Sequence, residues 1–79
     1  MVTDLLEHLA RRLVDEPDAV RVEREERDDV VVLRLFVAKD DVGKVIGRQG
    51  RIARALRTLV RASAAREGRR VMVEIADPE

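Results

Sequence analysis

A ten-residue stretch near the middle of the chain, VGKVIGRQGR at residues 42–51, holds residue types suited to binding a phosphate backbone. It contains three of the chain's four glycines and three cationic side chains. Glycine has no Cβ, so the main chain around it can approach a ligand closely, while lysine and arginine supply positive charge and hydrogen-bond donors. The stretch therefore predicts a loop that binds an anion.

The spacing of these glycines separates three ways in which a glycine-rich loop binds phosphate. A P-loop has four residues between its glycines and a lysine directly after the second, whereas Gly43 and Gly47 are separated by three residues and Lys44 comes too early. A dinucleotide-binding G-x-G-x-x-G loop would need glycine in place of Val45 and a strand directly before it. The remaining pattern is G-x-x-G at residues 47–50, between two helical segments. A helix connection that needs glycine for its geometry alone is the simpler alternative.

The cations of this loop belong to a larger basic segment, although the net charge of the chain is zero. Residues 1–43 hold seven cationic and twelve acidic side chains, and residues 71–79 hold three acidic ones. Residues 44–70 hold nine cationic side chains and one acidic, a net charge of +8. This segregation predicts a face that binds a polyanion. For Arg57 and Arg61, which lie farther from the loop, a solvated helix face or general electrostatic attraction is the alternative.

The composition argues against several other kinds of site. The 79-residue chain has no cysteine, which removes disulfides and thiolate metal sites and is typical of a reducing compartment. The first ten residues include two acids and no basic region before an apolar run, so we expect a cytoplasmic protein without signal peptide or membrane anchor. No catalytic triad or metal-ligand spacing is present, so we expect no enzyme, cofactor, metal or small-molecule substrate. With Phe36 as the one aromatic residue, base stacking on exposed rings is not expected.

Hydrophobic periodicity places the loop inside a small α+β domain that spans residues 1–79. Helical spacing predicts helices at 3–14, 41–46 and 51–65. Alternating or β-branched runs predict strands at 19–25, 30–37 and 70–76, with a polar turn at 26–29. The predicted order is αββααβ, and a three-stranded sheet with three helices on one face would bury the apolar sides of all six elements.

The predicted helix at 51–65 has two contrasting faces. At 100° per residue its larger apolar side chains fall together and are expected to face the core: Ile52, Leu56, Leu59 and Val60. Its basic side chains fall roughly opposite: Arg51, Arg54, Arg57 and Arg61. The helix therefore joins the core on one side and presents cations to solvent on the other.

The segment Val45–Ile52, VIGRQGRI, resembles the signature of the KH domain, and the αββααβ order is similar to its type II, bacterial form. The similarity covers nearly the whole chain. Among KH proteins, the chain most resembles the small stand-alone bacterial proteins of the KhpA type. One position departs from the common motif, because Ala53 stands where many KH domains have a branched apolar residue. The resemblance implies a loop that holds about four nucleotides of single-stranded RNA.

Loop chemistry and the resemblance together give the expected RNA contacts. Charge and hydrogen bonds at the tip come from Arg48 and Gln49, and the remaining cations flank them. The resemblance adds an apolar groove for the bases and a basic loop at its rim. The expected set is Lys44, Val45, Ile46, Gly47, Arg48, Gln49, Gly50, Arg51, Ile52, Arg54, Arg69 and Arg70.

The resemblance also implies partners and a cellular role. Besides single-stranded RNA, it implies a larger KH partner of the KhpB type, also called Jag or EloR, and self-association as a homodimer. It implies an RNA chaperone or post-transcriptional regulator linked to cell shape and cell-wall homeostasis. Two alternatives stay open: a KH fold that works mainly as a dimerising protein-interaction module, and a binder of single-stranded DNA, because nothing in the sequence reads a 2′-hydroxyl.

Overall fold

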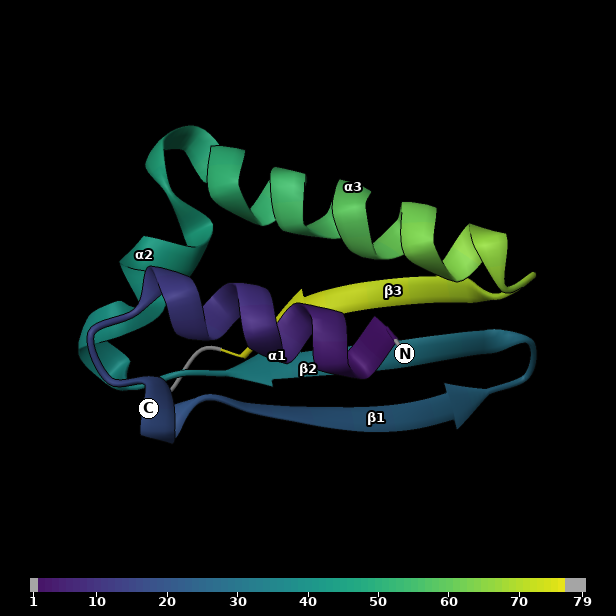
Figure 1. Ribbon diagram of the computed structural model, residues 1–79, viewed down its shortest axis with the longest axis horizontal. Helices are drawn as coiled ribbons and strands as arrows, with labels where there is room; N and C mark the ends of the chain where they lie inside the picture. The colour runs from purple at the N-terminus through teal and green to yellow at the C-terminus, as the bar shows by residue number, and fades with distance from the viewer. Residues whose placement is uncertain (1, 77–79) are drawn as a thin grey trace.

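The computed structural model describes residues 2–76, in which a three-stranded sheet carries three α-helices on one face (Figure 1). The elements in chain order are α1 (Val2–Leu13), β1 (Arg21–Arg27), β2 (Val30–Phe36), α2 (Val42–Ile46), α3 (Arg51–Arg66) and β3 (Arg70–Ile75). Single 3-10 turns lie at Pro17–Ala19, Lys39–Asp41 and Arg48–Gly50. The predicted αββααβ order and α+β class are confirmed.

The sheet is mixed, with β2 at its centre. β2 runs antiparallel to β1, where Phe36 pairs with Arg21, and parallel to β3, where Leu33 pairs with Val73. Parallel neighbours need a crossover connection, and α2, the glycine loop and α3 provide it. Because the sheet order is β1-β2-β3, one edge of β3 has no strand partner within residues 2–76, and α3 packs along this strand (Figure 1).

The first strand lies two residues later than the sequence predicts. The segment Pro17–Ala19 forms a 3-10 turn, in which the Val20 N–H donates to the oxygen of Pro17 at 3.1 Å, so the strand begins at Arg21 and not at residue 19. The strand then continues to Arg27 because the turn is shorter than predicted. Asp28 takes a φ of 51°, a left-handed conformation that aspartate tolerates, and closes a tight hairpin. The predicted end at residue 25 and the four-residue turn were therefore wrong.

The first helix is shifted by one residue at both ends, and each of the other predicted segments differs by one residue at one end, which is the usual uncertainty of helix and strand termini. The segments predicted at 3–14, 30–37, 41–46, 51–65 and 70–76 lie at Val2–Leu13, Val30–Phe36, Val42–Ile46, Arg51–Arg66 and Arg70–Ile75. Residues 1 and 77–79 of the predicted domain lie outside the described residues. No helix of residues 2–76 is long and apolar enough to cross a membrane.

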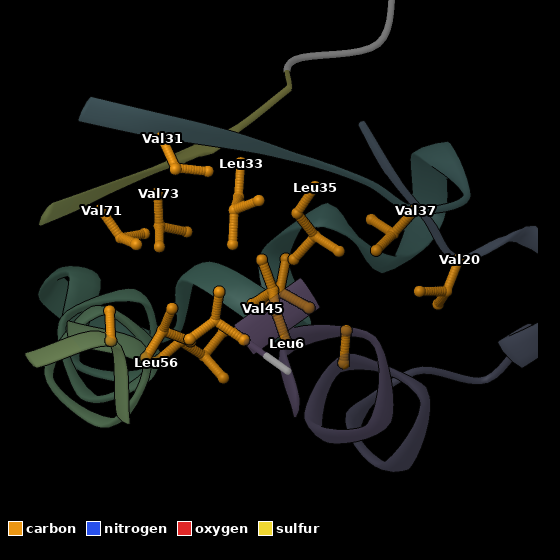
Figure 2. Close-up of a cluster of buried hydrophobic side chains, with 14 residues drawn as sticks. Leu6, Val20, Val31, Leu33, Leu35, Val37, Val45, Leu56, Val71 and Val73 are labelled. Atoms are coloured by element: carbon orange, nitrogen blue, oxygen red, sulfur yellow. The ribbon is translucent and has the colours of Figure 1, made fainter. Parts of the chain in front are cut away.

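The core lies between the helices and one face of the sheet. Alternate residues of β2 point into it, and Figure 2 shows Leu33 and Leu35 directed toward Leu6 of α1 and Val45 of α2. All four of these side chains are fully buried. Complete burial of one such side chain stabilises the fold by about 1.5–3 kcal/mol, so this layer holds the short helix α2, and with it the start of the glycine loop, against the sheet.

The buried face of α3 agrees with the predicted one at Leu56 and Val60 but not at Leu59. The side chains that reach the core are Ala53, Leu56, Val60 and Ala64. Leu59, which was predicted to face the core, is 51% exposed, and Ile52 is half-buried. Ala53 and Ala64 occupy the inner side, and the bulkier Leu59 lies outside the core, where it lines a groove together with Leu9 and Leu13 of α1. The prediction weighted side-chain size, whereas the observed packing uses small residues.

Candidate nucleic-acid interface

The glycine loop is a tight turn with an unusual main chain. Gly47, Gln49 and Gly50 have φ values of 75°, 57° and 73°. The Gly47 N–H closes α2 by donating to the oxygen of Gly43 at 2.9 Å, and the Gly50 N–H donates to the oxygen of Gly47 at 3.1 Å. With three left-handed residues out of four, the chain reverses between α2 and α3 within the span of the G-x-x-G motif. Figure 1 places this turn at one end of α3.

The two glycines of the motif are required for different reasons. A Cβ on Gly47 would lie 2.6 Å from Cγ1 of Ile52, closer than real Cβ contacts come, so this glycine permits Ile52 to pack on the turn. A Cβ on Gly50 would meet no atom within 4 Å. The space beside Gly50 is therefore open for a ligand to approach the main chain. Loop geometry alone accounts for Gly47, whereas Gly50 combines a left-handed φ with free access.

Three arginines lie within four residues of Gly50 in the loop and the first turn of α3. Arg48, Arg51 and Arg54 are exposed, and none of them takes part in an ion pair within residues 2–76. Nη2 of Arg54 donates to the main-chain oxygen of Gln49 at 3.0 Å, which ties the tip of the loop to the first turn of α3. That first turn has neither an acidic residue nor a side-chain cap. The N–H groups of Gly50 and Arg51 donate to the oxygens of Gly47 and Arg48. The N–H groups that follow them in this turn, and the positive end of the helix dipole, favour an anion at this place.

Lys44 was also predicted to bind RNA, but its ammonium already has two carboxylate partners. Nζ lies 3.0 Å from Oδ2 of Asp15 and 3.3 Å from Oδ1 of Asp41. Hydrogen bonds to Asp15 first, and to Asp41 second, raise the pKa of Lys44. Its charge is thus matched inside the protein, and its position fastens α2 to the connection between α1 and β1.

Asp41 is the buried member of this cluster, with 1% of its surface exposed. Oδ2 accepts a hydrogen bond of 3.1 Å from the main-chain N–H of Glu16. Burial by itself raises the pKa of Asp41, but hydrogen bonds from the main chain of Asp15 and Glu16 and from Lys44 outweigh it, so the net shift is downward. The carboxylate is therefore charged and satisfied, and its role is to hold the base of the loop in place.

The predicted apolar groove is only partly present. Val45 is completely buried in the core, so its predicted contact with bases is wrong. Ile46 is 38% exposed on α2, and Ile52 is half-buried against Gly47. These two side chains remain available beside the loop.

The two predicted rim residues lie far from the loop. Arg69 and Arg70 follow the last turn of α3, a helix of 16 residues and therefore about 24 Å long. Figure 1 places the connection from α3 to β3 at the end of the helix opposite to the glycine loop. Arg69 is paired with Glu26 of β1 at 3.1 Å. The loop and these arginines form two separate basic regions joined by the exposed face of α3.

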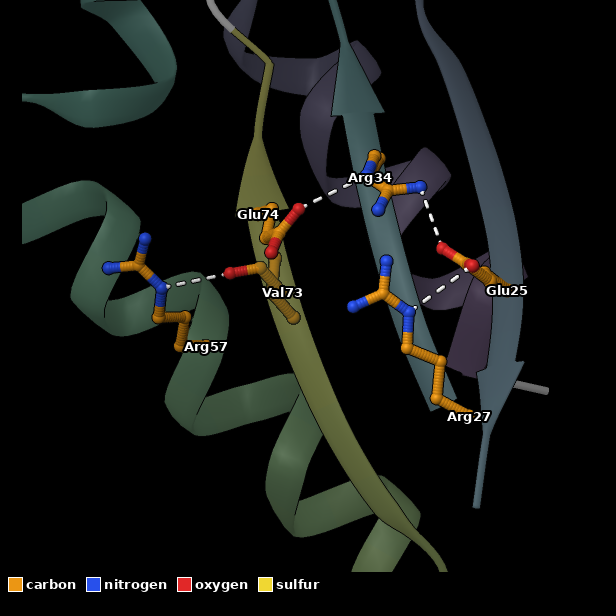
Figure 3. Close-up of polar contacts among 6 residues, drawn as sticks. All are labelled: Glu25, Arg27, Arg34, Arg57, Val73 and Glu74. Carbon is orange, nitrogen blue, oxygen red and sulfur yellow. Dashed lines mark hydrogen bonds and ion pairs between the residues drawn. The ribbon is translucent and has the colours of Figure 1, made fainter. Parts of the chain in front are cut away.

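One polar contact between α3 and the sheet was not predicted from the sequence. Nε of Arg57 donates to the main-chain oxygen of Val73 in β3 at 3.2 Å (Figure 3). Helical spacing places Arg57 on the basic face, one turn from Arg54 and Arg61. Its partner is a carbonyl of a strand 16 residues away, and no residue pattern marks such an acceptor.

An apolar groove between α1 and α3 was not predicted either. It encloses about 410 Å³ and is lined by Leu9, Arg12, Leu13, Arg51, Ile52, Ala55, Leu56 and Leu59. Leu59, which is 51% exposed, forms part of its lining. A helical wheel assigns all large apolar residues to the core. Leu59 was therefore noticed in the sequence, but it was assigned to the core and not to a groove on the surface.

Comparison with known proteins identifies a family that matches nearly the whole chain. The family model described as "KhpA/KhpB, KH domain" matches residues 3–75. "RNA-binding protein KhpA" of Clostridium acetobutylicum is 52% identical over 71 residues, which cover 90% of this chain and 95% of that protein. "RNA-binding protein KhpA" of Bacillus subtilis is 51% identical over 74 residues, 94% of this chain and 91% of that protein.

Two solved structures have a similar fold. Aquifex aeolicus Era bound to GDP and aluminium fluoride superposes with a TM-score of 0.69 at 20% identity, over 94% of this chain and 29% of that chain. Era in complex with MgGDPNP and a segment of 16S ribosomal RNA gives a TM-score of 0.66 at 19% identity, over 94% of this chain and 28% of that chain. The chain therefore spans less than a third of the length of either Era chain, and at these identities the likeness is one of fold.

Proposed function

The chain belongs to the KhpA/KhpB family of KH domains, and from this premise we propose that it is an RNA-binding protein whose Gly47–Gly50 loop grips single-stranded RNA. The observation that carries the proposal is the open space beside Gly50 at the start of α3, where no side chain caps the helix. Arg48, Arg51 and Arg54 belong to this loop and helix turn, and they have no ion-pair partner in residues 2–76. The names of the relatives at about 50% identity support RNA as the polyanion.

The binding mode follows from the main chain and the charges. Phosphate oxygens accept hydrogen bonds from the free N–H groups at the start of α3, and the absence of a Cβ at Gly50 lets the strand come close. Arg48, Arg51 and Arg54 contribute charge-assisted hydrogen bonds. The grip spans about four nucleotides, as in other KH loops. The function is binding without a chemical step, and no cofactor or metal takes part.

The test is to reverse the charge at the tip of the loop. The double variant Arg48→Asp with Gln49→Asp should weaken binding of a fluorescent eight-nucleotide RNA at least tenfold, measured by anisotropy. A control with the same change in charge, His8→Asp with Arg11→Asp on the exposed side of α1, should bind nearly as tightly as the wild type. Unchanged binding by the folded loop variant would refute the assignment. A single-stranded DNA of the same sequence tests the alternative ligand.

A second function, self-association or binding of a KhpB-type partner (Jag or EloR), is supported by the apolar groove between α1 and α3. Leu59 and Leu13 are 51% and 37% exposed at this groove, and large side chains left outside the core often mark an interaction surface. Two copies would raise the affinity of a short grip through effective concentration. Leu59→Lys should convert a dimer to a monomer in analytical ultracentrifugation. If the wild type is monomeric with and without KhpB, this second function is wrong.

We further propose a cytoplasmic role as an RNA chaperone or post-transcriptional regulator linked to cell shape and cell-wall homeostasis. The support is the family itself, because the matching model joins KhpA with KhpB. Crosslinking in cells followed by sequencing of the bound RNA tests it. The expected targets are transcripts of cell-wall and cell-shape genes, and a random set of transcripts would contradict the link.

A further inference from the structure

Arg57 is bonded to the edge of the sheet, and in residues 2–76 no other cation of α3 is. Its Nε donates to the oxygen of Val73 at 3.2 Å, and the side chain is half-buried between α3 and β3. This oxygen lies on the side of β3 that has no strand partner in the described part of the chain. The arginine thus supplies the hydrogen bond that a fourth strand would otherwise make.

This contact orients the guanidinium without neutralising its charge. None of the ion pairs between described residues involves Arg57, whereas Arg34 of β2 lies 3.0 Å from Glu25 and 3.1 Å from Glu74. Arginine carries five N–H donors in one plane, and a neutral carbonyl takes only one of them. In Figure 3 the two terminal nitrogens of Arg57 point away from β3, while Arg34 is held between its two carboxylates. Arg57 therefore presents a fixed, positively charged pair of donors.

The position of Arg57 is within reach of a strand held by the loop. It lies seven residues after Gly50, about 10 Å along the axis of α3. Arg54 and Arg61 continue the same face on either side, so a phosphate backbone that leaves the loop along α3 stays near positive charge. A base of this strand that turns toward the sheet meets the terminal donors of Arg57.

We propose that Arg57 selects the base bound between α3 and β3 and favours one with two adjacent hydrogen-bond acceptors. Guanine offers such a pair through O6 and N7, and cytosine offers one through O2 and N3. On these edges adenine and uracil have a hydrogen-bond donor next to the acceptor. One N–H of the arginine would then face another donor, and the second hydrogen bond could not form. This inference rests on the proposed RNA-binding function and adds base selection to it.

The test measures base preference separately from affinity. Anisotropy is recorded with four eight-nucleotide RNAs, one of uridine alone and three with a single central guanosine, cytidine or adenosine. The wild type should bind the guanosine or the cytidine RNA about tenfold more tightly than the other RNAs. Arg57→Lys keeps the charge but replaces the planar fork by a single ammonium, so this preference should fall within about twofold. Affinity for the uridine RNA should change little.

Arg61→Lys is the matched control, because Arg61 lies one turn further along the same face without a bond to β3, and it should keep the full preference. If Arg57→Lys lowers the thermal midpoint, Arg57→Gln, which retains an N–H donor toward Val73, replaces it. Whether guanosine or cytidine binds more tightly identifies the base edge. Equal binding of all four RNAs by the wild type, or full preference in the folded Arg57 variants, overturns the inference alone. No binding of any RNA overturns the proposed function as well.

Discussion

At the scale of single residues, the absence of a side chain has two separate consequences in the G-x-x-G loop. Gly47 and Gly50 both have a positive φ, but their ψ values differ. Gly50, at φ 73° and ψ 18°, is in the left-handed helical region, where an alanine costs about 1–2 kcal/mol. Gly47, at φ 75° and ψ 175°, is in a region that is essentially restricted to glycine, so an alanine there costs more. The surroundings differ, because Ile52 fills the space beside Gly47 and nothing fills the space beside Gly50. Gly47 is therefore needed mainly for the stability of the fold, and Gly50 mainly for access of the ligand to the main chain.

Gly50→Ala should leave the protein folded and weaken RNA binding. The left-handed φ lowers the free energy of unfolding by about 1–2 kcal/mol, and the new methyl group projects into the space where the strand approaches. We expect a loss of RNA affinity of at least fivefold by anisotropy, while the urea midpoint falls by about 1 M and the protein stays folded without urea. Wild-type affinity in this variant would mean that the main chain at Gly50 does not contact the ligand.

Gly47→Ala should act mainly on the fold. The methyl carbon would lie 2.6 Å from Cγ1 and 2.9 Å from Cβ of Ile52, and relieving this overlap adds to the cost of the left-handed φ. We expect the free energy of unfolding, measured in urea, to fall by about 2–4 kcal/mol, more than in Gly50→Ala. Equal stability of the two variants would contradict the division of roles between the glycines.

At the scale of helices and strands, the base of the loop depends on a buried carboxylate that joins two connections. Asp41 precedes α2 and accepts the N–H of Glu16, which lies between α1 and β1. Lys44 of α2 bridges the same two segments through Asp15 and Asp41. Because α2 has only five residues and would not be stable alone, these contacts and the burial of Val45 fix where the loop begins.

Asp41→Asn should reduce stability at pH 7 and flatten its dependence on acid. The pKa of Asp41 is lowered on folding from its ordinary value of 3.8, so its stabilising effect is complete above that value and disappears as the pH falls through the lower folded pKa. Thermal midpoints should therefore differ most at neutral pH and converge as the pH falls through the lowered pKa of folded Asp41. Hydrogen bonds from Arg27 and Arg34 also lower the pKa of Glu25, so Glu25→Gln serves as the comparison from the open face of the sheet. A difference that stays constant with pH would exclude the charge of Asp41 as the cause.

The elements themselves could be predicted from local patterns, but their contacts could not. Alternation in β2 and the G-x-x-G spacing identified the sheet and the loop, because both depend on near neighbours in sequence. For α3 the predicted burial of Leu56 and Val60 is confirmed, but a helical wheel ranks Leu59 above Ala53, whereas Ala53 is buried and Leu59 is exposed. The bond from Arg57 to Val73 and the pairing of Lys44 with Asp15 join distant segments, so only the fold reveals which cations are free.

At the scale of the whole molecule, folding sharpens the charge segregation of the sequence. The acidic remainder of the chain neutralises two cations of the basic segment, Lys44 through Asp15 and Asp41, and Arg69 through Glu26. The arginines on the loop and along the exposed side of α3 have no such partners within residues 2–76. The positive surface is thus concentrated on one helix and its N-terminal loop, which limits how many phosphates one copy can bind.

The dependence of RNA affinity on salt should therefore be shallow. If Arg48, Arg51 and Arg54 each neutralise one phosphate of a single strand, the slope of log K against log salt concentration is about −2. Arg51→Gln should reduce its magnitude by about 0.7, because one fewer counterion is released. Arg34→Gln, which removes a cation already paired with Glu25 and Glu74, should leave the slope unchanged.

Anisotropy titrations between about 50 and 300 mM salt measure the slopes of the wild type and of the two variants. A wild-type slope near −4, about six phosphates, would mean that Arg48 and all five arginines of α3 contact phosphate. Equal effects of the two variants would remove the distinction between paired and unpaired arginines.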